Sequence, residues 1–207
     1  MSRYGDVYEN SVTGERAVIL RGIEDADGRP VLVHLTVRPG GAVPGEHVHP
    51  HIREHFRVVA GTLGVRLGGV EGTLRAGEEA TVPPGLAHDW WNAGDDEASV
   101  LVEISPADPR FEALIATLFG LANAGRTNAK GMPGPLQLAL TGQEFADVIR
   151  FTRPPAAVQR LLFGVLGRLG RIRGKRGVYP EYLRPHGRTV PDAAVTALAG
   201  VTPPPGG

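Results

Sequence analysis

The sequence predicts a mainly β fold, a barrel or sandwich of short antiparallel strands, followed by about three α-helices. Two observations predict it. In the first half of the 207 residues, short apolar segments alternate with glycine, proline and aspartate; a spacing of about 8–12 residues between such segments is typical of sandwiches and barrels. After Pro106 the apolar residues recur with the helical period instead.

The predicted strands are separated by turn signals. Asp27-Gly28, Gly68-Gly69 and Pro83-Pro84-Gly85 supply residues that favour tight turns. No internal repeat appears, which indicates a single barrel. We expect strands at 16–21, 31–37, 54–60, 62–67, 72–75, 79–83, 87–92 and 98–104.

Capping residues mark the first two predicted helices. Asp108 is a candidate N-cap with Pro109 at the first helical position, and Gly125 is a candidate stop. The segment Thr141-Gly-Gln-Glu144 has the form of a capping box, so we expect a second helix from there to about Phe151.

The third predicted helix, 155–173, is amphipathic and basic. Residues 150–188 hold 10 Lys and Arg and one acid, a net charge of +9, whereas residues 1–149 hold 12 basic and 20 acidic side chains, a net charge of −8. We favour packing of this helix on the barrel or on a partner subunit; contact with an anionic membrane is a less favoured alternative. Its apolar stripe is Val158, Leu161, Leu162, Val165, Leu166, Leu169 and Ile172.

A two-part pattern of histidines carries the chemistry. It reads Gly41-x5-His47-x-His49-x4-Glu54-x6-Gly61 and then Gly77-x5-Pro83-x-Gly85-x2-His88-x3-Asn92. His47 and His49 share a face of an extended strand, whereas Glu54 has the opposite parity, so a turn or bulge near Pro50 is expected between them. Three imidazoles and one carboxylate suit Fe, Mn, Co, Ni, Cu or Zn. The alternative is that these are unrelated surface and core histidines. It is disfavoured because both halves of the pattern occur in order, with Gly, Pro and Asn at the intervening positions.

At these residues the chain resembles the cupin superfamily. The resemblance rests on GAVPGEHVHPHIREHFRVVAG and GEEATVPPGLAHDWWN and covers about residues 16 to 105. It implies a double-stranded β-helix, or jelly-roll barrel, of two antiparallel sheets. It also implies one divalent metal ion held by His47, His49, Glu54 and His88. We expect the barrel at 1–106, a helical extension packing on the barrel or on a dimer partner at 107–188, and a disordered tail at 189–207.

Strand parity predicts the pocket around the metal. Phe56 and Val58 share the parity of Glu54, and Trp90 shares that of His88, so these three side chains are expected to form an apolar wall. Plain core packing of Trp90 is an equally weighted alternative. Glu54 is a candidate proton acceptor, and His51 is a candidate proton shuttle near the mouth.

The resemblance fits several functions. We expect an enzyme acting on a small organic, possibly aromatic, substrate, with dioxygenation favoured. The alternatives are a metal-dependent isomerase, cyclase or lyase, and a non-catalytic small-molecule binding protein. A homodimer is expected from the resemblance and from exposed strand edges, and no nucleic-acid partner is expected.

Composition sets the remaining bounds. There are no cysteines, which excludes disulfides and thiolate metal sites. No N-terminal segment has the form of a secretory signal, and no apolar segment has the length needed to cross a bilayer. We therefore expect a cytoplasmic protein.

Overall fold

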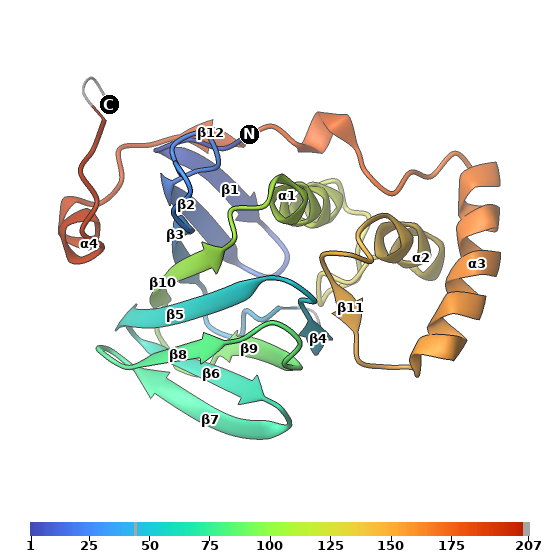
Figure 1. The fold of residues 1–207 in the computed structure, drawn as a ribbon, viewed down its shortest axis with the longest axis horizontal. Helices are drawn as coiled ribbons and strands as arrows, with labels where there is room; N and C mark the ends of the chain where they lie inside the picture. Colours follow the sequence, from blue (N-terminus) through green and yellow to red (C-terminus); the bar gives the residue numbers. More distant parts are fainter. Residues whose placement is uncertain (44, 205–207) are drawn as a thin grey trace.

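The computed structural model describes residues 1–43 and 45–204. Within them, two antiparallel sheets face each other and four α-helices follow, which confirms the predicted fold class (Figure 1). Among the described helices, none combines the length and hydropathy needed to span a membrane.

The larger sheet has seven strands in the order β12-β1-β2-β3-β10-β5-β8. β5 and β10 pair over nearly their whole length, from Ser105 opposite Arg53 to Ser99 opposite Ala60. The bounds of its strands are β1 Asp6–Asn10, β2 Glu15–Arg21, β3 Val31–Val37, β5 Arg53–Ala60, β8 Glu79–Val82, β10 Ala98–Ser105 and β12 Gly187–Arg188.

The smaller sheet has five strands in the order β11-β4-β9-β6-β7. Their bounds are β4 His47–Val48, β6 Thr62–Leu67, β7 Val70–Arg75, β9 His88–Asn92 and β11 Arg150–Phe151. Gly61 turns β5 into β6 with a φ of +78°, and a Cβ atom there would lie 2.9 Å from the backbone of Ala98. A side chain at this position would therefore be both strained and crowded.

Side chains that alternate between the two faces of each strand fill the space between the sheets on one side. On β2, Ala17 and Ile19 face the main core, whereas Leu20 faces outward to a second cluster. The main core continues onto the first helix through Phe111 and Leu114. Eight predicted strands are confirmed within a few residues, whereas β1, β4, β11 and β12 were not predicted because they are short or polar.

The first helix, α1 (Pro109–Asn123), forms as predicted. The side chain of Asp108 accepts a hydrogen bond from the backbone N–H of Arg110, and Gly125 follows the helix with a φ of +67°. The buried face of α1 lies against the core between the sheets. Figure 1 shows α1 nearest the sheets, α3 farthest from them and α2 between the two.

The second helix departs from the prediction. α2 spans Pro135–Glu144, with Gly134 at the N-cap and Pro135 at the first position. The expected capping box at Thr141 was wrong, because Thr141 lies buried inside the helix, where its hydroxyl accepts a hydrogen bond from Gln137. A turn follows the helix and replaces the predicted helical segment up to Phe151.

The third helix, α3 (Ala156–Ile172), forms within the predicted range. The chain then passes through the 3-10 turn η1 (Pro180–Tyr182) and returns to the larger sheet as β12. β11, just before α3, adds to the smaller sheet beside β4. The segment after the strands therefore contributes to both sheets.

A fourth helix, α4 (Ala193–Leu198), lies in the segment for which the sequence predicts disorder. The side chain of Asp192 caps it by accepting from the N–H of Val195 at 3.0 Å. Val195 packs with Leu20 and Leu101 on the outer face of the larger sheet. This contact supplies apolar burial that local composition does not reveal; residues 205–207 of the predicted tail lie outside the described residues.

Candidate metal centre and the cavity behind it

Four buried side chains meet at one end of the sandwich. His47 lies in β4, His49 follows it, Glu54 lies in β5 and His88 opens β9. One ligand atom from each lies within 4.8 Å of the others. The structure thus brings together all four predicted ligands from three separate segments of the chain.

The two sheets supply opposite sides of this cluster. β4 and β9 are neighbours in the smaller sheet, and His47 pairs directly with His88. β5 belongs to the larger sheet, so Glu54 approaches the histidines from the facing sheet. The chain bends at Pro50 and His51, between β4 and β5, as strand parity predicts.

All three histidines present the same ring nitrogen to the centre. Since a carbonyl oxygen can only accept, each Nδ1 that contacts one carries the hydrogen and donates it. The ring is thereby oriented and the Nε2 atom is left for a ligand, the usual arrangement around protein metal sites. The donor–acceptor pairs are His47 to Gly45 at 3.0 Å, His49 to Val148 at 2.7 Å and His88 to Leu86 at 3.0 Å.

Glu54 provides the negative charge. Its Oε2 atom lies 2.9 Å from Nε2 of His88 and 3.6 Å from Nε2 of His49. Burial opposes ionisation of Glu54, but the hydrogen bond from His88 and the charges of the histidines hold the pKa of Glu54 below its ordinary value.

The histidines respond to this carboxylate in different ways. Burial disfavours the charged form of His88, but the hydrogen bond to Glu54 and its charge raise the pKa of His88. Burial, followed by the charges of His88 and His49, lowers the pKa of His47 to about 4. The cluster therefore favours a positive charge on His88 beside Glu54 and a neutral imidazole at His47.

These residues fit a divalent transition metal. Neutral imidazole and carboxylate are preferred ligands of such ions. The three Nε2 atoms already face the carboxylate, and their rings are held by backbone carbonyl groups. The donor set is common to several metals, so it does not select among Fe, Mn, Ni, Co, Cu and Zn.

Residues from the helical segment support the cluster. The ring of Phe111 in α1 lies edge-on to His49, with 5.2 Å between ring centroids. The carbonyl that holds His49 belongs to Val148, in the turn after α2. Arg110 binds the carboxylate of Asp147 in this turn through two hydrogen bonds of 2.7 and 2.8 Å. The turn is thus fastened to α1 while it orients a predicted ligand.

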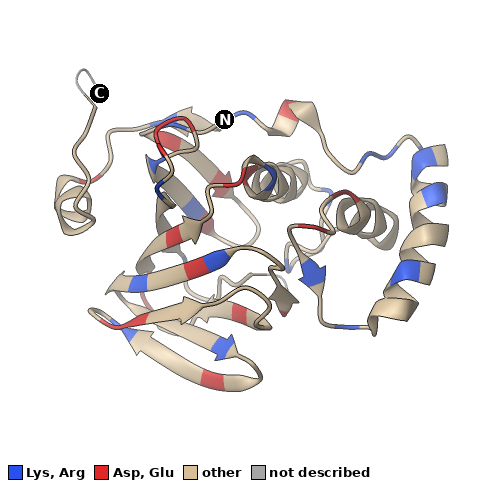
Figure 2. Cartoon of the chain, viewed as in Figure 1, with Lys and Arg blue, Asp and Glu red and all other residues tan. Residues whose placement is uncertain are grey.

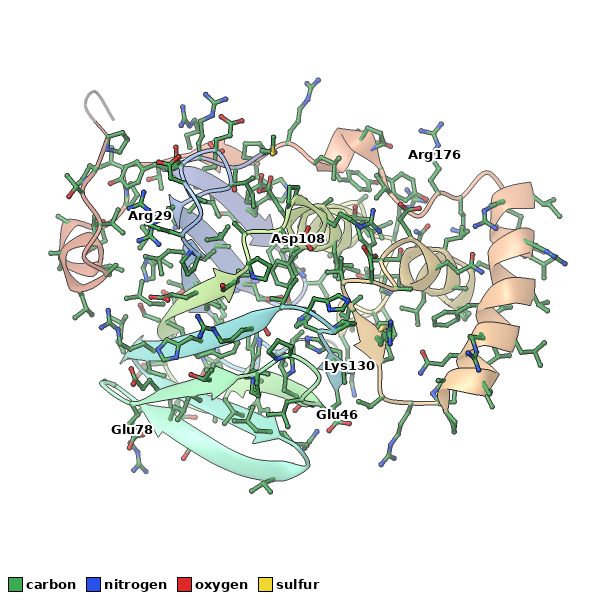
Figure 3. All side chains as sticks on the ribbon, in the orientation of Figure 1. Arg29, Glu46, Glu78, Asp108, Lys130 and Arg176 are labelled. Carbon is green, nitrogen blue, oxygen red and sulfur yellow. The ribbon has the colours of Figure 1, made fainter. Side chains whose placement is uncertain are left out.

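A cavity of about 120 Å³ extends from the cluster into the sandwich, beneath α1. Glu54 lines it and is also a candidate metal ligand. Asp108, labelled in Figure 3 at the start of α1, lines it as well. Most of the wall is apolar and includes Val33, Leu35, Phe56, Trp90, Ile104 and Phe119.

Two polar side chains on β1 and β2 also line this cavity. Tyr8 is 4% exposed, and its hydroxyl has no hydrogen-bond partner among the described residues. Burial, followed by the charges of Glu112 and Asp6, raises the pKa of Tyr8. Glu15 is 7% exposed and accepts a hydrogen bond from the hydroxyl of Thr13. Burial raises its pKa to about 7, although the hydrogen bond from Thr13 opposes the shift.

The predicted pocket residues divide into two groups. Phe56 and Trp90 line the cavity, with 6.4 Å between their ring centroids. Val58 is fully buried in the core and is not among the described lining residues. His51 is exposed and stands outside the four-residue cluster.

Sequence reasoning missed several residues of the site. Glu15 carried a signal, because it has the inward parity of Ala17 and Ile19 on β2 and is charged. Phe111 was assigned to a helix, but nothing in the sequence connects it with His49. Val148 acts through its backbone carbonyl, which its side-chain identity does not reveal.

Comparison with known proteins identifies the domain that contains these residues. Residues 33–104 match a family model described as a cupin domain. The chain is 38% identical over 74 residues to polyketide synthase CurC of Streptomyces cyaneus, covering 36% of this chain and 47% of that protein. It is 38% identical over 93 residues to oxalate oxidase 2 of Hordeum vulgare, covering 40% of each. The chain thus spans about half the length or less of these curated relatives.

Solved structures show a likeness at lower identity. KdgF from Halomonas sp. is 20% identical with a TM-score of 0.43, over 49% of this chain and 87% of that one. A predicted oxalate decarboxylase from Thermotoga maritima is 19% identical with a TM-score of 0.43, over 50% and 97%. The family match and the buried ligand cluster together lead to one conclusion: the chain carries a cupin domain with a candidate His/His/Glu/His metal centre, followed by C-terminal helices.

Proposed function

We propose that the protein is a metal-dependent enzyme that transforms a small organic molecule in the cavity beneath α1, with dioxygenation as the favoured reaction. One observation carries the proposal: Glu54 belongs to the ligand cluster and also lines the cavity. A molecule in the cavity therefore lies against the candidate metal centre.

His47, His49, Glu54 and His88 would hold the metal. A divalent transition metal at this position supplies a Lewis-acidic centre and, if it is redox-active, electron transfer with dioxygen and an organic substrate. The surrounding residues shield the site from solvent: Phe111 and the turn carrying Val148 cover His49, which is 4% exposed. A dry site strengthens every electrostatic interaction inside it.

Glu54 is the candidate proton acceptor. Its lowered pKa keeps the carboxylate ionised near neutral pH, and its position in the cavity wall allows it to receive a proton from a bound hydroxyl group. His51, which is exposed at the adjacent bend, is proposed to exchange protons with solvent.

The cavity limits the size of the substrate. Its volume of about 120 Å³ is close to that of an apolar protein cavity of about 150 Å³ that binds benzene. The apolar wall favours a single ring or a short carbon skeleton. Tyr8 and Glu15 offer hydrogen bonds to one polar group of the substrate, since the Tyr8 hydroxyl has no other described partner.

The relatives support enzymatic activity in general. Their names include a polyketide synthase protein of Streptomyces glaucescens, TcmJ, and oxalate oxidases. A redox-neutral isomerase, cyclase or lyase is the second candidate, because a metal held by these four residues could act as a Lewis acid without redox chemistry. A non-catalytic binding protein is the third, because the same cavity and metal could retain a ligand unchanged.

Oxygen consumption distinguishes these candidates. Protein loaded with iron, nickel, cobalt or manganese is mixed with a panel of single-ring phenols and enediols, and oxygen uptake is followed together with product formation. We expect uptake that requires both metal and substrate. Turnover under strict anaerobiosis would contradict dioxygenation and support the redox-neutral alternative, and recovery of an unchanged bound ligand would support the binding protein.

A matched pair of variants controls for the metal. His49→Ala removes a ligand, whereas His55→Ala removes the neighbouring histidine, which points away from the cluster and contacts the hydroxyl of Thr81 at 2.8 Å. We expect activity to be lost in the first variant and retained in the second. Equal activity in both would refute the proposal.

A further inference from the structure

Helix α3 turns its apolar face away from the rest of the chain. The leucine and valine stripe was predicted to be buried, but the buried positions of α3 are Gly167 and Gly170. These glycines bring α3 close to α2: a Cβ atom at Gly170 would lie 2.7 Å from the side chain of Leu140. The glycine side of the helix therefore packs, and the stripe does not.

The uncovered face is continuous. Its six large apolar side chains have exposed fractions between 43% and 80%. The face runs from Val158 to Ile172, which corresponds to about four turns and roughly 21 Å along the 17-residue helix. The α3 apolar face consists of Val158, Leu161, Leu162, Val165, Leu169 and Ile172.

Basic residues flank this face along one side. At 3.6 residues per turn, Arg168 lies next to the apolar face, whereas Arg160 and Arg171 lie closer to the glycine face. Arg171 donates a hydrogen bond of 3.0 Å to the side-chain oxygen of Gln143 on α2. None of the three arginines forms an ion pair with a described carboxylate. On α3, Figure 2 shows basic residues in blue and no Asp or Glu in red. After the helix, Arg176 points outward from the molecule (Figure 3).

A second copy of the chain fits this face poorly. If two α3 apolar faces packed together, the positively charged arginines of both copies would be brought close to one another at one small interface. The acidic half of the chain offers no matching apolar surface among the described residues, because its exposed large apolar side chains are isolated: Met1 precedes β1 and Val70 lies on β7. Neither arrangement supplies both the apolar and the negative partner that α3 requires.

An anionic lipid surface supplies both. We propose that α3 docks in the plane of a membrane that contains negatively charged lipids. Its apolar face then inserts at the boundary between headgroups and acyl chains, and its arginines contact lipid phosphates. Long arginine side chains can reach the headgroups while the apolar residues beside them are buried. The glycine face remains packed on α2, so the helix needs no rearrangement to bind.

Vesicle binding by the full-length protein tests this proposal. The probes are vesicles of pure phosphatidylcholine and vesicles of equal parts phosphatidylcholine and phosphatidylglycerol, in flotation assays at low and high salt. We expect binding to the anionic vesicles, at least about tenfold weaker binding to the neutral ones, and weakening by salt. Equal binding to both, or no binding to either, would overturn the proposal.

Variants separate the apolar and basic contributions. Leu161→Gln with Ile172→Gln replaces the two most exposed apolar side chains of the face, and Arg160→Gln with Arg168→Gln removes two charges. We expect each pair to weaken partitioning by about tenfold or more. The matched control is Val70→Gln, which is 73% exposed on β7 and should bind as the parent protein does.

Two further results would overturn the proposal. One is a dimer in light-scattering measurements that dissociates on Leu161→Gln with Ile172→Gln, which would assign the face to a second copy. The other is binding to duplex DNA in place of vesicles. Metal content and thermal unfolding are measured for every variant, and unchanged values confirm that lost vesicle binding does not arise from misfolding.

Discussion

Glu15 makes the stability of the fold depend on pH. Its carboxyl group is buried on β2, and burial raises its pKa from 4.5 to about 7. In the unfolded chain the same group ionises near its ordinary pKa. Because the native state holds this proton more tightly, ionisation of Glu15 opposes folding. The favourable contribution is present below about pH 4.5 and is lost as the pH rises through about 7.

The size of the effect follows from the two pKa values. The difference between the two pKa values corresponds to about 3 kcal/mol when the transition is complete. Part of the transition lies outside an accessible pH range, so between pH 5 and pH 8 we expect a loss of about 2–3 kcal/mol. Glu15→Gln retains the shape of the neutral side chain and its contact with Thr13, but it cannot ionise.

Urea unfolding at pH 5 and pH 8 measures this difference. Both proteins are studied in the same metal state, so that other titrating groups contribute equally. We expect the parent protein to lose about 2–3 kcal/mol more than the Glu15→Gln variant between the two pH values. Identical pH dependence of the two proteins would refute the assignment of a raised pKa to Glu15.

Three other substitutions test the packing of the cavity and the sheets by urea unfolding. Tyr8→Phe removes a buried hydroxyl that has no described partner, so we expect the ligand-free protein to gain about 1 kcal/mol of stability; a loss would show that the hydroxyl is satisfied. Leu114→Ala empties a buried position on α1 and should cost about 2–5 kcal/mol, and a change near zero would mean that α1 does not pack on the sheets. Gly64→Ala places a Cβ atom 2.2 Å from the ring of Trp91 and should cost about 1–3 kcal/mol, a result that unchanged stability would contradict.

The candidate ligand set could be predicted because most of it lies close together in the sequence. His47, His49 and Glu54 lie within eight residues, and their parity alone required the bend at Pro50 that the structure contains. His88 is distant, but the second half of the pattern marks it. The support for His49 was not predictable, because Val148 and Phe111 reach the site through tertiary packing.

The helices show the same difference between local signals, which the sequence reveals, and tertiary packing, which it does not. Local caps predicted the start of α1 at Asp108, yet the similar signal at Thr141 was misleading, since Pro135 had already begun α2. For α3 the periodicity gave the helix and its apolar stripe. It did not show that Gly167 and Gly170 would form the packed side, because close approach to α2 depends on the surface that α2 presents.

The metal content of purified protein tests the central claim most directly. The protein is purified without chelator, loaded with a single divalent metal, and analysed by elemental mass spectrometry after desalting. We expect about one metal ion per chain in the parent protein and in His55→Ala, and loss of most of it in His49→Ala. Full retention of metal by His49→Ala, or no retention by the parent protein, would contradict the assignment of His47, His49, Glu54 and His88 as a metal centre.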